Sequence, residues 1–354
     1  MSTHRQIASH ATTGTMSDEP SQPVQPSIVP TRRTALLRAA NPGGHDTGTH
    51  PENPFRLVAI DQELQRQRLI DGRPAVTVTP ATQEAVERVH DAGYVRALRG
   101  VAAGGGGWLD ADTLVAPDSV DVALDAAGAA IAGVDAALSG QSDRSFALVR
   151  PPGHHATPAR GMGFCLLNSV AIAAAHALSQ GLERILIVDW DVHHGNGTQD
   201  AFVESDRVLF CSIHQSPLYP GTGAATERGI GRGTGFTRNV PLPPGRGDRE
   251  YLRAFDDQIA PLAEQYRPEL VLISAGFDAH IADPIGGMRL SEAGFAALAT
   301  RVVDLAVAAP AGGKVVAVLE GGYDPAALGR SVAAVLRVLD GDATHADRET
   351  REQR

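Results

Sequence analysis

Cysteine is scarce in this sequence, and so is lysine. Two cysteines, Cys165 and Cys211, occur in 354 residues, which excludes a disulfide framework and favours a reducing compartment. The N-terminus lacks a basic region followed by an apolar segment, so no signal peptide is predicted and we expect a cytoplasmic protein. Many alanines and glycines with few lysines are typical of bacterial proteins.

A long uncharged apolar run is also lacking. The longest stretch of small residues, 119–140, contains Asp121, Asp125 and Asp135, which predicts a helix of a soluble fold and no membrane span. Positive charge is in deficit, because the formal net charge is -10 at pH 7. This balance argues against nucleic acid as a partner and suits a cationic substrate such as a lysine or a polyamine.

The composition divides the chain into three parts. Residues 1–32 are rich in Ser, Thr, Pro and Gln without apolar periodicity, which predicts a disordered leader. Residues 343–354 are charged, which predicts a loose tail. No linker and no internal repeat interrupts residues 33–342, so we expect a single domain there.

Within this domain, short apolar runs alternate with alanine-rich helical stretches. The predicted strands are 146–149, 185–189, 208–213, 270–274 and 315–319. The predicted helices include 169–179, 249–265 and 291–308. Runs that are apolar on both faces favour a parallel sheet covered on each side. The alternation therefore predicts an α/β fold with a central, mostly parallel β-sheet flanked by helices.

Each predicted strand is followed by polar residues that can perform chemistry. The segments are PPGHH (151–155), DWDVHHGNG (189–197), SIH (212–214), AGFDAH (275–280) and EGGY (320–323). In open α/β sheets, ligands bind at the carboxyl ends of the strands. The sequence therefore predicts an active site at this edge of the sheet.

Asp191, His193 and Asp278 form a candidate metal triad. If the segment after residue 189 stays extended, Asp191 and His193 point the same way, and Asp278 joins them from a later strand end. Three protein ligands with an open position are typical of a catalytic zinc site, although Fe(II) or Co(II) would also be accepted. A lone Asp-x-His more often caps a helix and binds water, but the convergence of five strand ends favours the metal.

Two histidines and a tyrosine are candidates for the chemistry itself. His154 and His155 can move a proton while water attacks a carbonyl, and Asp189 and Asn196 can orient their rings. Tyr323 can donate its hydroxyl to a developing oxyanion. The ordinary alternatives are a histidine pair on the surface and a tyrosine that fills a turn.

Seven stretches, in order along the chain, resemble the histone deacetylase family, which has the arginase–deacetylase fold. They are RPPGHHA (150–156), GFCLLNSVAIAA (163–174), DWDVHHGNGTQ (189–199), PGTG (220–223), NVPLP (239–243), SAGFDAH (274–280) and EGGY (320–323). The resemblance covers about residues 34–340. The spellings PPGHHA and HHGNGTQ resemble the class II branch and its bacterial relatives, the histone deacetylase-like amidohydrolases and the acetylpolyamine amidohydrolases.

The resemblance implies roles for these residues. The candidate metal triad matches the zinc ligands, His154 and His155 match the tandem histidines with His155 as general acid and base, and Tyr323 matches the carbonyl-polarising tyrosine. Asn196 stands where class I enzymes have Asp, so it can orient His155 without a charge that raises the pKa of that ring. Gly195 and His280 stand where arginase-like enzymes have further Asp ligands, so a dinuclear manganese site is not expected.

The resemblance also implies cation sites. A structural potassium ion would be held by Asp189, Ser212 and Ile213 with the backbone carbonyls of Asp191 and His193. A second cation site would involve Phe202, Ser205, Val208 and Phe236.

Residues around the substrate are implied in the same way. Gly163, Phe164 and Tyr219 match the wall of a narrow acyl-lysine tunnel, which suits a four-carbon stem, and Asp110 matches a rim aspartate that grips the substrate backbone. Ile285 stands where a polyamine-specific relative carries Glu, and it offers no anchor for a second ammonium group. The loop before residue 56 also contains four polar residues, His45, Asp46, His50 and Glu52. They either shape substrate access to the tunnel or are simply solvated.

These features predict a zinc-dependent deacylase that hydrolyses N-acyl-lysine or a similar acylated amine. The alternatives are an acetylpolyamine amidohydrolase and a catalytically silent acyl-lysine-binding module. Because relatives often form dimers or tetramers, we expect a homo-oligomer.

Overall fold

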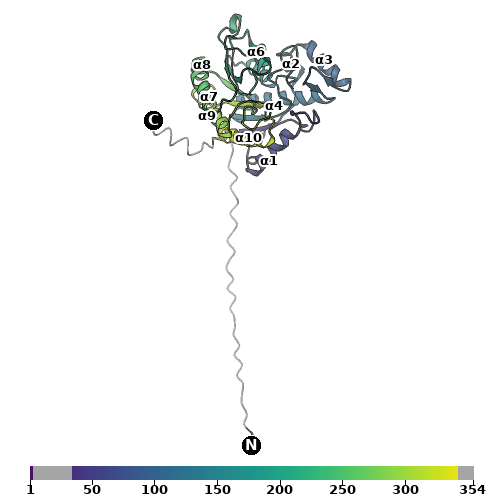
Figure 1. Cartoon of the computed structure of the whole chain (residues 1–354), viewed down its shortest axis with the longest axis vertical. Coiled ribbons are helices and arrows are strands. Elements are labelled where there is room, and N and C mark those ends of the chain that lie inside the picture. Colours follow the sequence, from purple (N-terminus) through teal and green to yellow (C-terminus); the bar gives the residue numbers. More distant parts are fainter. Residues whose placement is uncertain (3–33, 342–354) are drawn as a thin grey trace. The chain divides into compact units, whose positions relative to one another are not determined.

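A computed structural model describes residues 1–2 and 34–341. The predicted leader (1–32) and tail (343–354) lie outside the described residues, apart from residues 1 and 2, and both stay predictions. Residues 34–341 belong to one compact unit, in which helices surround a sheet (Figure 1).

Seven parallel strands form the central sheet. In chain order they are β1 (Thr34–Arg38), β4 (Arg144–Leu148), β5 (Ile185–Asp189), β6 (Val208–Gln215), β7 (Thr237–Leu242), β8 (Leu270–Ala275) and β9 (Val315–Leu319). Their order in space is β1-β4-β9-β8-β5-β6-β7, and each neighbouring pair is parallel. A separate antiparallel pair is formed by β2 (Gly107–Trp108) and β3 (Leu114–Val115). The predicted parallel α/β sheet is confirmed.

The sheet separates two hydrophobic cores. Every residue of β5 is buried, and because side chains alternate along a strand, its residues divide between the two faces. Leu186 and Val188 pack in one core, whereas Ile185 and Ile187 pack in the other. Continuous apolar runs in the sequence are therefore the consequence of a sheet covered on both sides.

Different helices cover the two faces. The core around Ile187 contains residues of α2 (Gln83–Glu87), α3 (Ala92–Ala103), α4 (Ser119–Ser139), α5 (Ser169–Ser179) and α6 (Asn196–Phe202). The core around Val188 contains residues of α1 (Phe55–Arg66), α7 (Asp248–Ala254), α8 (Ala260–Tyr266), α9 (Glu292–Ala308) and α10 (Pro325–Asp340). A 3-10 turn lies at Gly231–Gly233.

The predicted helices are observed with one difference. The helix at 169–179 has the expected bounds, and α9 begins after Ser291, whose side chain accepts a hydrogen bond from the Gly294 N–H. The predicted helix 249–265 is instead α7 and α8 joined by a π-helical turn, Phe255–Ile259. Pro261 lies at the start of α8 and has no N–H to donate, so the regular hydrogen-bond ladder cannot continue through it.

Helix α4 is the one helix in the described part of the chain that is long and apolar enough to cross a membrane by composition. In the structure, 78% of its most apolar window is buried within the protein. Gly133 lies so close to β4 that an added Cβ would be 2.5 Å from the Ser145 hydroxyl. It is therefore a core helix pressed against the sheet.

Candidate active site

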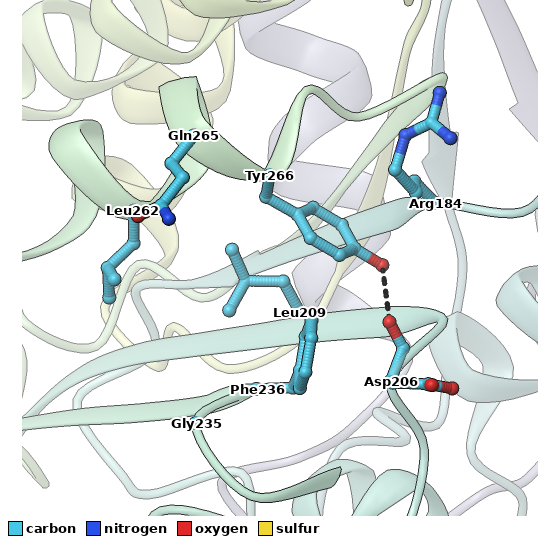
Figure 2. Close-up of a pocket in the computed structure, with 8 residues that line it drawn as sticks. All are labelled: Arg184, Asp206, Leu209, Gly235, Phe236, Leu262, Gln265 and Tyr266. Atoms are coloured by element: carbon cyan, nitrogen blue, oxygen red, sulfur yellow. Dashed lines mark hydrogen bonds between the residues drawn. The ribbon is translucent and has the colours of Figure 1, made fainter. Parts of the chain in front are cut away.

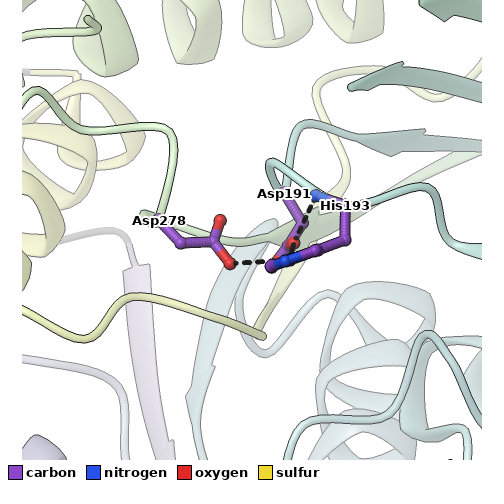
Figure 3. A group of neighbouring side chains, drawn as sticks. All are labelled: Asp191, His193 and Asp278. Atoms are coloured by element: carbon purple, nitrogen blue, oxygen red, sulfur yellow. Dashed lines mark hydrogen bonds and ion pairs between the residues drawn. The ribbon is translucent and has the colours of Figure 1, made fainter. Parts of the chain in front are cut away.

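The candidate metal triad assembles at the carboxyl ends of β5 and β8. These strands are neighbours, and Asp189 is in register with Ser274, so the segments that follow them leave the sheet side by side. The His193 Nδ1 atom lies 3.1 Å from Asp191 Oδ1 and 3.2 Å from Asp278 Oδ2. The three side chains converge (Figure 3), with their candidate ligand atoms within 4.8 Å of one another.

Backbone N–H groups hold both carboxylates of the triad. The Gly321 N–H donates to Asp191 Oδ2 at 2.9 Å, and the Val192 N–H donates to Asp278 Oδ1 at 2.8 Å. Asp278 Oδ2 is buried and accepts no hydrogen bond, although His193 Nδ1 lies 3.2 Å away. A buried carboxylate oxygen without a hydrogen bond is unfavourable, so this atom has the capacity to bind a cation.

The electrostatics of the triad also fit a cation. Burial and the neighbouring Asp191 carboxylate raise the pKa of Asp278 to about 7. Although burial opposes it, Asp191 and Asp278 together raise the pKa of His193 to about 10. A cluster that draws protons onto its own members carries excess negative charge, which a divalent metal would neutralise. The nitrogen and oxygen donors, without cysteine, fit a divalent metal such as zinc.

The tandem histidines lie beside the triad with their ring centroids 4.1 Å apart. His154 Nδ1 lies 3.0 Å from Asp189 Oδ2, and His155 Nδ1 lies 2.7 Å from Asn196 Oδ1. Both rings are almost fully buried. Asp189 and Asn196 therefore each lie within hydrogen-bond distance of one of the two rings.

The pKa values of the two histidines are shifted in opposite directions. Burial lowers the pKa of His155 well below its ordinary value, and the charges of His154 and His193 lower it further. Burial acts on His154 as well, but the carboxylates of Asp191 and Asp189 outweigh it and raise the pKa of His154 well above its ordinary value. At neutral pH the pair therefore combines a neutral imidazole with a charged one.

A cavity of about 140 Å³ opens onto these groups. Rings form its walls: Tyr219 packs edge-on against His155 with centroids 5.1 Å apart, and Phe164 against Tyr323 at 5.8 Å. Gly163 has a φ of +55°, and an added Cβ would lie 2.5 Å from the His155 ring. The lining residues are Asp112, Pro152, His154, His155, Gly163, Phe164, His193, Tyr219, Ile285 and Tyr323.

Asp112, which the sequence reasoning missed, lines this cavity, whereas the predicted Asp110 does not. The Asp110 carboxylate instead accepts hydrogen bonds from the backbone N–H groups of Asp112 and Thr113, at 3.2 and 2.8 Å. This is the usual role of Asp at the start of a turn. The spacing of the two aspartates in LDADT could have indicated this. The first Asp accepts backbone hydrogen bonds within the turn, so the second is the one available to line the cavity.

The loop before α1 differs from its expected role. His45 and Glu52 are buried and cannot lie at the mouth of the tunnel. Glu52 forms a two-pronged ion pair with Arg150, at 2.6 and 2.7 Å, and also pairs with Arg56 at 3.2 Å. His50 does lie near the mouth, with its ring 4.5 Å from Phe164, and Asp46 is exposed. The sequence did not reveal this because Arg150 is distant from Glu52 in the chain.

The two predicted cation sites stay predictions, and the structure places their residues on β5, β6 and the adjoining segments. Asp189 and Ser212 are paired in register on β5 and β6, and Ile213 follows. For the second site, the Ser205 N–H donates to the Phe202 carbonyl at 2.9 Å. The other two residues, Val208 and Phe236, lie at the start of β6 and just before β7.

An added Cβ at Gly195 would lie 2.1 Å from Asp189 Oδ2, so a side chain at this position would require Asp189 to move. Within residues 34–341, the candidate metal triad is the one cluster of this kind.

A larger cavity, of about 420 Å³, is lined in part by residues just before β5, β6 and β7, and so lies at the amino ends of these strands; Figure 2 shows its lining. Its charged side chains are already paired: Arg184 with Glu269 at 3.0 Å, and Asp206 with Arg232 at 2.9 Å. The cavity is lined by Arg184, Asp206, Leu209, Gly235, Phe236, Leu262, Gln265 and Tyr266. It has no histidine and no unpaired carboxylate, so it is not the candidate active site.

Together the parallel sheet and the buried Asp–His–Asp cluster, with paired histidines and a tyrosine at the strand ends, define a hydrolase-type site in an α/β fold. Residues 50–339 match the profile described as "Histone deacetylase domain". The chain belongs to the histone deacetylase family, whose members named below are deacetylases and amidohydrolases.

Individual relatives agree with this assignment. A "Probable deacetylase" of Archaeoglobus fulgidus is 46% identical over 277 residues, which cover 78% of this chain and 77% of that protein. A "Histone deacetylase-like amidohydrolase" of Pseudomonas aeruginosa is 42% identical over 294 residues, covering 82% and 77%. The crystal structure of the HDA15 HD domain matches with a TM-score of 0.82 and 37% identity over 89% of this chain and 90% of that chain. The predicted arginase–deacetylase fold is confirmed.

Proposed function

We propose that this protein is a zinc-dependent deacetylase that hydrolyses the amide of N-acetyl-lysine or a similar acylated amine. The observation that carries the proposal is one cavity lined by a triad residue, His193, together with both tandem histidines and Tyr323. The related deacetylases and amidohydrolases support the reaction type. We further propose a cytoplasmic homo-oligomer with a structural potassium ion at Asp189 and Ser212.

Asp191, His193 and Asp278 would hold the metal. When bound, a divalent metal there polarises a carbonyl and makes a nearby water molecule more acidic. His155 is the base that removes the proton from the attacking water. Because the Asn196 carbonyl oxygen only accepts hydrogen bonds, the proton of the neutral His155 ring lies on Nδ1, so Nε2 is the basic atom. The same Nε2 then delivers the proton to the departing amine.

His154 and Tyr323 stabilise the charge that develops on the amide oxygen and its surroundings. Asp189 contacts His154 at Nδ1, and the raised pKa of His154 keeps this ring positively charged. Burial raises the pKa of Tyr323 well above its ordinary value, so its hydroxyl keeps its proton and can donate it as a hydrogen bond to the oxyanion. His154 is buried and Tyr323 is partly buried, which makes their effect larger than in water.

The substrate class follows from the walls of the cavity. The rings of Phe164 and Tyr219 suit an apolar stem, and Asp112 at the lining can accept a hydrogen bond from a substrate N–H. Ile285 provides no charge for a second ammonium group, which favours acyl-lysine over an acetylpolyamine as the substrate.

The test is a matched pair of substrates, a fluorogenic acetyl-lysine peptide and N-acetylputrescine, each assayed after chelation and after zinc is restored. We expect zinc-dependent turnover, faster for the lysine substrate. Faster turnover of N-acetylputrescine would instead support the acetylpolyamine amidohydrolase. No turnover of either, with metal bound, would leave the silent binding module as the better interpretation.

A further inference from the structure

The peptide bond that precedes Tyr323 is held at both ends. Arg56 Nε donates to the Gly322 carbonyl at 2.8 Å, and the Tyr323 N–H donates to Asp283 Oδ2 at 2.7 Å. Gly322 has a φ of +124°, a conformation that a side chain would strain. The orientation of this one peptide plane therefore sets the direction in which the Tyr323 ring leaves the backbone.

On the Arg56 side, the hydrogen bond to this peptide plane comes from a buried side chain that other residues hold in place. Its guanidinium is buried, pairs with Glu52 and lies 5.0 Å from the centroid of the Tyr323 ring. Arg150 fixes Glu52 in turn through two hydrogen bonds. This side of the peptide is thus supported by a buried network of charges.

The Asp283 end has a second connection. While Oδ2 accepts from Tyr323, Oδ1 accepts from the Ile285 N–H at 2.9 Å and from the Gly286 N–H at 3.3 Å. Ile285 lines the cavity, and Asp283 itself is 8% exposed and does not. One carboxylate therefore joins the backbone of the tyrosine to the backbone of the residue at the mouth.

We propose that Asp283 is a positioning residue that sets Tyr323 for oxyanion stabilisation and Ile285 for substrate selection, an inference that rests on the proposed function. A carboxylate can accept from both N–H groups at once, and charge-assisted hydrogen bonds are the stronger kind. An oxyanion donor is effective only at the correct distance, so a small displacement of Tyr323 lowers turnover.

The proposal predicts non-additivity between two substitutions. In Asp283→Asn, one of the two accepting oxygens is replaced by an amide donor, and we expect kcat for the acetyl-lysine peptide to fall about 10- to 100-fold. In a Tyr323→Phe background the same substitution should change kcat less than about 3-fold, since the hydroxyl to be positioned is gone. An equal loss in both backgrounds would overturn the proposal and assign Asp283 a merely structural role.

Asp340→Asn is the matched control. It also removes one buried carboxylate, one that pairs with Arg73 at 2.9 Å at the end of α10. We expect it to lower the melting temperature without lowering kcat. If Asp340→Asn lowered kcat as much as Asp283→Asn, general destabilisation would explain both and the proposal would be wrong.

A second readout needs no turnover. The chain has five tyrosines, so fluorotyrosine labelling gives few 19F signals, and Tyr323→Phe identifies the relevant one. In zinc-loaded Asp283→Asn we expect that signal to shift or split while the other four stay in place. An unchanged Tyr323 signal would overturn the proposal, whatever the activity of the wild-type protein. A wild-type protein that hydrolysed neither substrate would refute the proposed function but not this positioning role.

Discussion

The cavities at the two ends of the strands, amino and carboxyl, differ in character. The cavity at the amino ends of the strands is larger, about 420 Å³ against about 140 Å³, yet its two charged residues, Arg184 and Asp206, each form an ion pair with a residue outside the lining. The smaller cavity at the carboxyl ends lies beside buried groups with shifted pKa values and beside an Asp278 oxygen that accepts no hydrogen bond. Perturbed, incompletely paired groups locate the chemistry better than volume does.

The backbone explains part of this difference. At the carboxyl ends, the chain turns away from each strand and its N–H groups point into the site, where Gly321, Val192 and Gly153 donate to buried carboxylates. The sequence continues these strands with glycines where side chains would collide. At Gly276, for example, an added Cβ would lie 2.1 Å from Asp191 Oδ2.

Of the substitutions at the two ends of the strands, Asp278→Ala is expected to have the largest effect on activity. Removing this ligand should abolish stoichiometric zinc binding and lower kcat by at least about 10³-fold, because the metal supplies several kcal/mol of stabilisation. Metal content by mass spectrometry and turnover of the acetyl-lysine peptide measure both effects. Asp206→Ala, at the larger cavity, is the control and should retain zinc and activity. Retained zinc in Asp278→Ala would contradict the assigned triad.

Tyr323→Phe should have the next largest effect. Loss of one oxyanion donor typically lowers kcat by about 10²–10³-fold, and KM should change little because the ring that packs against Phe164 is kept. Steady-state kinetics separate the two parameters. Unchanged turnover would remove Tyr323 from the mechanism.

Ile285→Glu should change selectivity by a smaller factor. A carboxylate at the mouth would attract a second ammonium group, and one exposed ion pair of about 1 kcal/mol corresponds to less than tenfold. We expect the ratio of kcat/KM for N-acetylputrescine to that for the acetyl-lysine peptide to rise by about fivefold. Ile285→Gln, which has a similar shape without charge, is the control and should leave the ratio near its wild-type value.

Asn196→Asp should move a pH profile rather than the maximal rate. The reaction needs neutral His155, so activity rises as pH increases through the pKa of that ring, which burial now holds low. A carboxylate beside Nδ1 favours the protonated ring and raises its pKa, so the acidic limb of kcat/KM should move to higher pH by about one unit. A shift to lower pH would mean that another group controls this limb.

Tyr266→Phe should have the smallest effect. The hydroxyl makes one long contact, 3.5 Å from the Asp206 carbonyl (Figure 2), so its removal should cost at most about 1 kcal/mol of stability and leave kcat unchanged. Thermal denaturation and turnover check this. A clear loss of kcat would show that the two edges are coupled.

Much of this arrangement could be predicted from the sequence, because each catalytic group directly follows an apolar run. The strands at 185–189 and 315–319 have the predicted bounds, and the triad assembles as expected. The edge strands β1 and β7 were missed, since β7 is only partly buried and contains Pro241. What the sequence could not show were contacts between distant segments, such as Glu52 with Arg150 and Asp283 with Tyr323, and the choice of Asp112 over Asp110.

The crossed support of the triad has a thermodynamic consequence. The Gly321 N–H after β9 holds the Asp191 carboxylate after β5, while the Val192 N–H after β5 holds the Asp278 carboxylate after β8. An ion bound by these side chains would join the ends of β5 and β8 directly, and that of β9 through the Gly321 N–H, and these segments meet only in the folded chain. Folding and metal uptake are then linked, so the melting temperature should rise with the logarithm of free zinc concentration. Heat denaturation thus becomes a titration of the metal that requires no substrate at all.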